Sequence, residues 1–206
     1  MKRAPQLAVM SILALSALPV AQGQCQYTVK SWAPWPCSGG LPMYSVITGL
    51  NNLEAWCGYR PKCHGATGDI PVYCPPGGSP QELPLPPGAG PKGAQAGAVN
   101  DFGVDVGFSF QGTSGTVKIG CIWKPDGTVT TIAPFPDGVI SPPYAVNKQG
   151  TVVGTSAGKP YVWSNGEMTL IPTPVEFPGG YATDISDSGF VVGEYGHHSN
   201  GSLRGF

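Results

Sequence analysis

The sequence predicts an all-β repeat protein, organised as an incomplete or open β-propeller-like array of about four blade units. Three features support this fold class: a motif that recurs along the chain, short runs of β-branched and aromatic residues, and turn pairs between those runs. The 31 Gly and 23 Pro among 206 residues fall at repeated offsets between the runs. Such regular placement favours many tight turns over disorder.

The recurring motif is strongest in residues 98–107, 145–154 and 184–193, and a degenerate copy spans 49–58. The glycines that end these four segments are separated by 49, 47 and 39 residues. Repeats with periods of roughly 40–50 residues form either propeller blades or helical arrays. The spacing alone therefore leaves both architectures open.

Strand-like patterning decides between these architectures. Residues 151–154, 161–163 and 168–171 are short, rich in β-branched and aromatic side chains, and bounded by turn residues. Asp126-Gly127 and Asn165-Gly166 supply the positive φ angles that tight hairpins require. After the N-terminal region, no segment repeats apolar residues at the spacing of a helix. Each unit is therefore expected to be a set of hairpin-connected strands.

Residues 1–23 have the layout of a secretory signal peptide, and we expect them to be removed. Lys2 and Arg3 form the basic start, residues 7–20 are apolar, and a small-residue site ends at Gly23. The apolar run is shorter than the roughly 20 residues that a membrane-spanning helix needs. The protein is therefore predicted to be secreted, to an extracellular or periplasmic location, and not to span a membrane.

The charge balance disfavours a nucleic-acid partner. Removal of Lys2 and Arg3 reduces the eleven basic side chains to nine, against twelve acidic ones. Proteins that bind nucleic acid usually present a basic surface. No nucleic-acid partner is therefore predicted.

Two regions are expected after the signal peptide. Residues 24–90 form a cysteine-rich, degenerate first unit with a Pro- and Gly-rich exit, and residues 91–206 form three further repeats. The last repeat is predicted to be truncated, because the sequence ends at Phe206, two positions before the tryptophan that its pattern requires.

Five of the six cysteines lie within fifty residues in the first unit. In an exported chain this density predicts a disulfide-stapled unit. Cys121 instead occupies an aromatic position of the motif and is expected to be a buried free thiol. A metal site from the same cysteines and His64 is disfavoured, because the Cys-x-x-Cys pairs of structural zinc sites are absent. The candidate disulfide cysteines are Cys25, Cys37, Cys57, Cys63 and Cys74.

The motif also carries a family resemblance. The string Ala-x-Asn-x-x-Gly-x-x-Val-Gly is followed by an aromatic residue, one further residue and Trp, and then by Gly and a Leu-Ile-Pro exit. This string resembles the extracellular HAF repeat of secreted bacterial proteins. The resemblance implies a propeller-like all-β fold outside the cytoplasm and implies no reaction. The matching segments are 98–107 with 121–127, 145–154 with 161–171, 182–206, and, loosely, 27–86.

The recurring positions of the motif are expected to serve the backbone rather than a ligand. Glycine allows positive φ angles and close strand approach, Asn caps a turn with its side chain, and Trp packs between sheets. These structural positions are Asn100, Gly103, Gly107, Trp123, Asn147, Gly150, Gly154, Trp163, Gly189 and Gly193.

No linear motif for catalysis, metal binding or cofactor binding is present. The sequence lacks a nucleophile elbow, a phosphate loop and a His-Glu-x-x-His segment. Residues 184–189 are similar to an acidic calcium loop, but Tyr195 stands where a bidentate Glu is needed. His197 and His198 follow Glu194 in a Gly-rich stretch that is typical of a solvated loop. No catalytic residue, metal ligand or cofactor is predicted.

We therefore expect a secreted, non-enzymatic binding or surface-scaffold module whose partner is a glycan or a surface protein. The alternative is a fragment of a secreted propeller-fold hydrolase or lyase acting on a glycan. The active residues of such an enzyme would come from several blades and form no linear motif. Loop carboxylates such as Asp101 and Glu194 would then be the candidates for catalysis.

Overall fold

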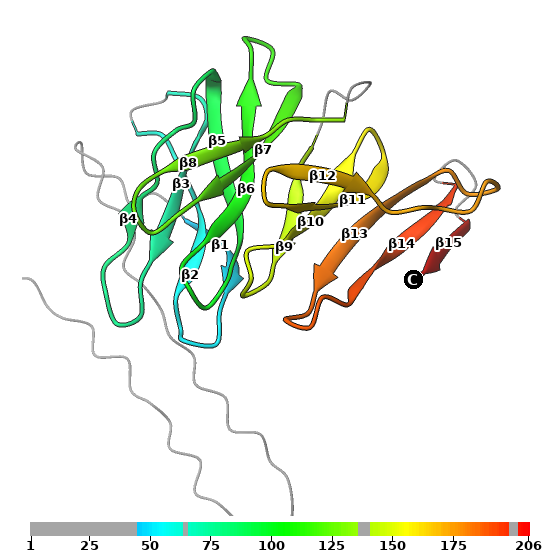
Figure 1. The fold of residues 1–206 in the computed structure, drawn as a ribbon. Helices are drawn as coiled ribbons and strands as arrows, with labels where there is room; N and C mark the ends of the chain where they lie inside the picture. The colour runs from blue at the N-terminus through cyan, green and yellow to red at the C-terminus, as the bar shows by residue number, and fades with distance from the viewer. Residues whose placement is uncertain (1–44, 64–65, 136–140, 198–201) are drawn as a thin grey trace, which may run out of the picture. The chain divides into compact units, whose positions relative to one another are not determined.

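In the residues that it describes, the computed structural model has fifteen β-strands (Figure 1). The residues it describes are 45–63, 66–135, 141–197 and 202–206. Within them there is no helix, so the predicted all-β class is confirmed. This part of the chain accordingly has no helix long and apolar enough to cross a membrane. The predicted signal peptide, Cys25 and Cys37 lie outside the described residues.

The strands follow one another as antiparallel meanders, which we number in chain order. The first meander contains β1 (Val46–Leu50), β2 (Trp56–Pro61), β3 (Asp69–Cys74) and β4 (Gln81–Glu82). The second contains β5 (Ala89–Val99), β6 (Asp105–Gln111), β7 (Val117–Trp123) and β8 (Val129–Ile132). The third contains β9 (Pro143–Val146), β10 (Val152–Ser156), β11 (Lys159–Ser164) and β12 (Glu167–Leu170). The fourth contains β13 (Gly179–Ile185), β14 (Val191–His197) and β15 (Ser202–Gly205).

One parallel pairing joins the first two meanders. Asp69 of β3 lies opposite Gly93 of β5, so these meanders form a single eight-stranded sheet. The contact requires glycine, because a Cβ on Gly93 would lie 1.9 Å from the carbonyl oxygen of Asp69. The third and fourth meanders form separate sheets of four and three strands. The described strands thus make three sheets, where four separate blade-like units were expected.

The first strands of the meanders are neighbours. β1 contacts β5, β5 contacts β9, and β9 contacts β13 (Figure 1). Each of these strands runs directly into a tight turn that leads to the second strand of its meander. Four turns from distant parts of the sequence are thereby brought into one row.

Each first strand also carries an irregularity in its pairing with the second strand. The extra residues are Thr48, Gly97, Tyr144 and Thr183, each flanked by a shift of register. The second strand places a glycine at every one of these bulges, namely Gly58, Gly107, Gly154 and Gly193. A Cβ at these glycines would lie 1.9 to 2.3 Å from a backbone carbonyl oxygen of the first strand or of the residue before it. The backbones approach too closely there for any side chain.

Three apolar core clusters lie between consecutive meanders, in addition to a small cluster of Trp56, Val72 and Cys74 within the first meander. Each of the three combines side chains from one meander with side chains from the next. The first contains Cys57, Ala94, Ala96, Val99, Cys121 and Trp123. The second contains Val106, Ile122, Ile132 and Val152, and the third contains Ala145, Val153, Ala182 and Ile185. Each of the two middle meanders therefore buries both of its faces.

Two cysteines of the first meander, Cys57 and Cys74, differ from the prediction. Cys57 and Cys74 are buried free thiols, and so is Cys121, for which a buried thiol was expected. Cys57 pairs with Tyr73 across β2 and β3, so Cys57 and Cys74 are offset by one residue and face opposite sides of the sheet. They belong to different core clusters and cannot bridge each other. The prediction that these two cysteines form disulfides is therefore wrong for this structure.

Candidate binding site

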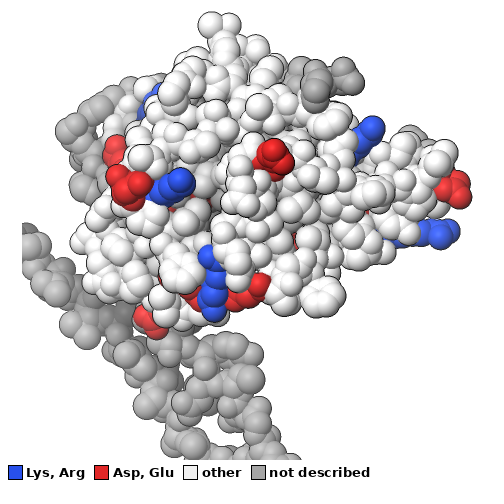
Figure 2. Space-filling view, in the orientation of Figure 1, with Lys and Arg blue, Asp and Glu red and all other residues white. Residues whose placement is uncertain are grey.

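The row of turns at the ends of the first strands brings together polar side chains from all four meanders. We call it the turn row; it comprises residues 51–54, 100–103, 147–150 and 186–189. Elsewhere charged side chains are scattered, and most of the face shown in Figure 2 is uncharged. In every turn the amide of the fourth residue donates to the carbonyl oxygen of the first, at 3.0 to 3.3 Å. Glycine at the fourth position has a positive φ in three turns, and Glu54 takes the same conformation in the first.

The first residue of each turn also caps it with a side-chain oxygen. Asn100 Oδ1 accepts hydrogen bonds from the amides of Phe102 and Val104, both at 3.0 Å. Asn147 Oδ1 accepts from Thr151, and Ser186 Oγ accepts from Phe190. Such side-chain caps are the usual use of Asn and Ser in tight turns.

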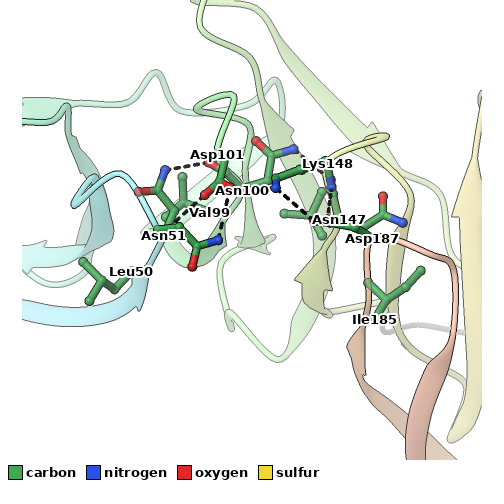
Figure 3. A pocket seen from close by; sticks show the side chains of 11 residues that line it. Leu50, Asn51, Val99, Asn100, Asp101, Asn147, Lys148, Ile185 and Asp187 are labelled. Carbon is green, nitrogen blue, oxygen red and sulfur yellow. Dashed lines mark hydrogen bonds and ion pairs between the residues drawn. The ribbon is translucent and has the colours of Figure 1, made fainter. Parts of the chain in front are cut away.

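The same asparagines connect each turn to the next. Asn51 Nδ2 donates to Asn100 O at 2.8 Å, Asn100 Nδ2 to Asn147 O at 2.8 Å, and Asn147 Nδ2 to Ser186 O at 3.2 Å (Figure 3). The partners are 49, 47 and 39 residues apart in sequence. These are the spacings of the recurring motif, so the ladder of hydrogen bonds links equivalent positions of consecutive meanders.

The second residues of the turns form a line of charged and amide groups beside this ladder. Asn52 donates from its backbone N and from Nδ2 to the carboxylate of Asp101 at 3.0 and 3.1 Å. Lys148 Nζ lies 3.2 Å from Asp101 Oδ2 and 3.1 Å from Asp187 Oδ2 (Figure 3). One ammonium group therefore connects carboxylates from the second and fourth meanders.

These contacts hold the three charged groups ionised. Hydrogen bonds from the Asn52 side chain, and further ones from Asn52 N and Lys148, lower the pKa of Asp101. A hydrogen bond from the backbone of Lys148 lowers the pKa of Asp187. The hydrogen bonds to Asp187 and then Asp101 raise the pKa of Lys148. The side chains of Lys148 and Asp187 are exposed, whereas that of Asp101 is only 13% exposed, and all three groups keep their charges at neutral pH.

A pocket of about 140 Å³ lies along the turn row. Its lining comes from all four meanders: Leu50, Asn51, Asn52, Val99, Asn100, Asp101, Val146, Asn147, Lys148, Ile185 and Asp187. The pocket has room for one polar group of a larger ligand rather than for a whole cofactor. The third residues of the first two turns are apolar and exposed to solvent. Leu53 is 55% exposed and Phe102 is 64% exposed.

The structure places the predicted backbone positions in three settings. Asn100 and Asn147 belong to the hydrogen-bond ladder, and Gly103, Gly150 and Gly189 end the turns. Gly107, Gly154 and Gly193 stand at the bulges. Trp123 and Trp163 lie in the third strands of their meanders, in or against the core clusters between meanders. None of these glycines or tryptophans lines the turn-row pocket.

The two candidate catalytic carboxylates are not brought together. Asp101 lines the pocket, whereas Glu194 lies within β14 opposite Tyr181 and does not line it. Sequence reasoning missed Asn52, Lys148 and Asp187. The signal was available, because these residues and Asp101 occupy the same position in the four copies of the motif, and the charge alternates from Asp101 to Lys148 to Asp187.

Neither a search for metal-binding side chains nor comparison with known proteins assigns a function to the turn row. Within the part of the chain that the structure describes, no group of three or more His, Cys, Asp or Glu side chains could hold a metal ion. Comparisons of the chain with family models, with curated proteins and with solved structures give no match. The turn row must therefore be interpreted from its own geometry.

Proposed function

We propose that the chain is a secreted, non-enzymatic binding or surface-scaffold module, and that the turn row is its ligand-facing end. In this proposal the four meanders are HAF-like units of an incomplete or open β-propeller-like array. The observation that carries it is the asparagine ladder, whose steps of 49, 47 and 39 residues match the motif spacing. A ladder of this kind would fix four turns in one rigid surface.

The chemistry of that surface supports a glycan as the ligand, with a surface protein as the other partner class. Asn52, Asp101, Lys148 and Asp187 offer amide, carboxylate and ammonium groups that can bind hydroxyls. The exposed ring of Phe102 offers an apolar face next to them. Apolar and aromatic surface with a few placed polar groups is typical of ligand sites.

The alternative function, a glycan hydrolase or lyase, has weaker support from the same residues. A general acid at neutral pH needs a raised pKa. Hydrogen bonds lower the pKa values of Asp101 and Asp187, so neither carboxyl would hold a proton. Burial raises the pKa of Asp105 to about 8, but this side chain is only 1% exposed and cannot reach a polysaccharide.

A glycan array probed with the full exported chain tests the proposal. We expect binding to one or more polysaccharides, with no new reducing ends and no unsaturated sugar ends after prolonged incubation with each bound glycan. New reducing ends would establish a hydrolase, and unsaturated ends a lyase. If the array retains no glycan, the next test is binding to a defined surface protein. Absence of binding to both classes of partner would contradict the proposal.

A further inference from the structure

Trp123 and Trp163 hold the same place in consecutive meanders. Trp123 pairs with Asp105 across β6 and β7, and Trp163 pairs with Val152 across β10 and β11. Both indoles pack in or against the core cluster that joins their meander to the preceding one. The two side chains can therefore be compared directly.

The surroundings of the two indoles differ. Trp123 is 1% exposed, and its Nε1 donates to the carbonyl oxygen of Pro84 at 2.8 Å. Leu83 packs on the same cluster, so the segment that follows β4 covers this indole. Trp163 is only half-buried, and no acceptor for its Nε1 is found within the described residues. The indole of Trp163 therefore keeps an unused donor that solvent can reach.

The region beside Trp163 is a groove of about 380 Å³. Thr130, Thr131 and Phe135 line it from β8 and the segment that follows, and Trp163 and Met168 line it from the hairpin of β11 and β12. Ala133 also lines the groove and follows buried Ile132, as Pro84 follows Leu83 in the first meander. The space that is closed over Trp123 is thus open over Trp163.

The lining defines the chemistry of the ligand. None of the side chains around the groove is charged, so a charged ligand would lose its hydration without gaining a partner. Trp163, Phe135 and Met168 offer apolar surface, while the threonine hydroxyls and the indole N–H offer hydrogen bonds. A neutral pyranose ring combines an apolar C–H face with a rim of hydroxyls and fits both requirements.

We propose that this groove binds a neutral sugar residue of a glycan, with the indole of Trp163 as its platform. The groove shares no lining residue with the turn-row pocket. This inference rests on the proposed binding function, to which it adds a second site and a ligand class. It does not depend on Lys148 or on the carboxylates that Lys148 joins.

Calorimetric titration of the full exported chain with cellohexaose, xylohexaose and mannohexaose tests this inference. We expect saturable binding of at least one of these neutral hexasaccharides. Trp163→Phe removes the indole N–H and part of the platform, and should weaken binding by about fivefold or more. Trp163→Ala should abolish it. Thr131→Val, which changes an exposed hydroxyl without altering size, should weaken it by a smaller factor.

Trp123→Phe is the matched control. It removes an indole N–H at the equivalent position, but that donor is used by Pro84, so the variant should lose stability and keep its sugar affinity. Lys159→Ala should also keep this affinity, because Lys159 lines neither the groove nor the turn-row pocket. Binding that Lys148→Ala weakens and Trp163→Phe leaves unchanged would belong to the turn row, which separates failure of the groove from failure of the turn row. The inference is overturned if no hexasaccharide binds at about 10 mM, if Trp163→Phe and Thr131→Val both bind like the parent, or if decaproline competes for the groove while the sugars do not.

Discussion

Asp105 of β6 and Cys57 of β2 lie together in the core between the first and second meanders, where the charge of Asp105 adds to burial in raising the pKa of Cys57. Asp105 is 1% exposed, Cys57 is fully buried, and Asp105 Oδ1 has no hydrogen-bond partner within the described residues. The corresponding positions at the next interface are held by Val106 and Val152. The interface between the first two meanders thus has a carboxyl and a thiol at positions where the next interface has two valines.

The buried carboxyl of Asp105 predicts that the free energy of unfolding depends on pH. Burial raises the pKa of Asp105 from 3.8 to about 8. A carboxyl whose pKa is higher in the folded than in the unfolded protein binds its proton more tightly in the folded state. Its contribution to the free energy of unfolding is complete below the unfolded-state pKa and is lost as the pH rises towards the folded-state pKa. The free energy of unfolding should therefore fall between about pH 4 and pH 8, by up to roughly 5 kcal/mol.

Urea unfolding at pH 5 and pH 8 measures this effect. Asp105→Asn should remove most of the difference between the two pH values, and Asp105→Val should stabilise the protein further at pH 8. Asp126→Asn is the control, because Asp126 is exposed and its pKa is lowered by hydrogen bonds from Thr128, so it stays ionised throughout this range. Equal pH dependence in the parent and in Asp105→Asn would contradict the prediction.

Asn147 should contribute to stability in two separable ways. Its Oδ1 caps its own turn, and its Nδ2 donates to Ser186 O in the next turn. Asn147→Ser should keep the cap, as Ser186 does in the fourth meander, and should cost about 1 kcal/mol. Asn147→Ala loses both functions and should cost about 2 kcal/mol or more. Equal destabilisation of the two variants in thermal unfolding would show that the cap has no separate role.

Gly107 should tolerate no side chain. A Cβ there would lie 2.1 Å from Gln95 O and 2.8 Å from Ala96 Cα, so Gly107→Ala should destabilise the fold by about 2–3 kcal/mol. Gly97 lies in the neighbouring strand, where a Cβ would meet only Val106 O at 3.5 Å. Gly97→Ala should therefore be neutral or stabilising by about 0.5 kcal/mol. Denaturant midpoints that reverse this order would disprove the role given to the bulge.

The buried thiols should be inert in the folded protein. Burial raises the pKa values of Cys57 and Cys121, that of Cys121 to about 11, so little thiolate forms at neutral pH. Iodoacetamide should leave Cys57, Cys74 and Cys121 unmodified in the native chain and should modify all three after unfolding without a reductant. Peptide mass spectrometry can follow this. A requirement for reductant before Cys57 or Cys74 reacts would show that they are in disulfides.

The fold class could be predicted from the sequence because its signals are local. Asn165 and Gly166 both have positive φ angles in the turn between β11 and β12, and residues 161–163 lie in a strand, as their patterns indicate. The pairing of Asp69 with Gly93 could not be predicted, since it depends on how two meanders meet. For the same reason, cysteine spacing did not show that Cys57 and Cys74 face opposite sides of one sheet.

The candidate site was only half visible in the sequence. Asn100 and Asn147 were recognised as turn caps, but the donation of each to the next turn needs the first strands to be neighbours. Lys148 can be recognised as part of the site only in the folded chain, where its ammonium group lies between the carboxylates of Asp101 and Asp187. Charges that are 39 and 47 residues apart become one site through the fold alone.

The most direct test of the account is the affinity of the exported chain for a glycan selected from the array, measured by calorimetry on three proteins. In Lys148→Ala the carboxylates of Asp101 and Asp187 lose their shared partner, so binding at the turn row should weaken by about tenfold or more. Lys159→Ala removes the same charge from an exposed hairpin between β10 and β11, away from the turn-row pocket, and should bind like the parent. If Lys148→Ala binds as tightly as Lys159→Ala, the turn row is not the ligand-facing end.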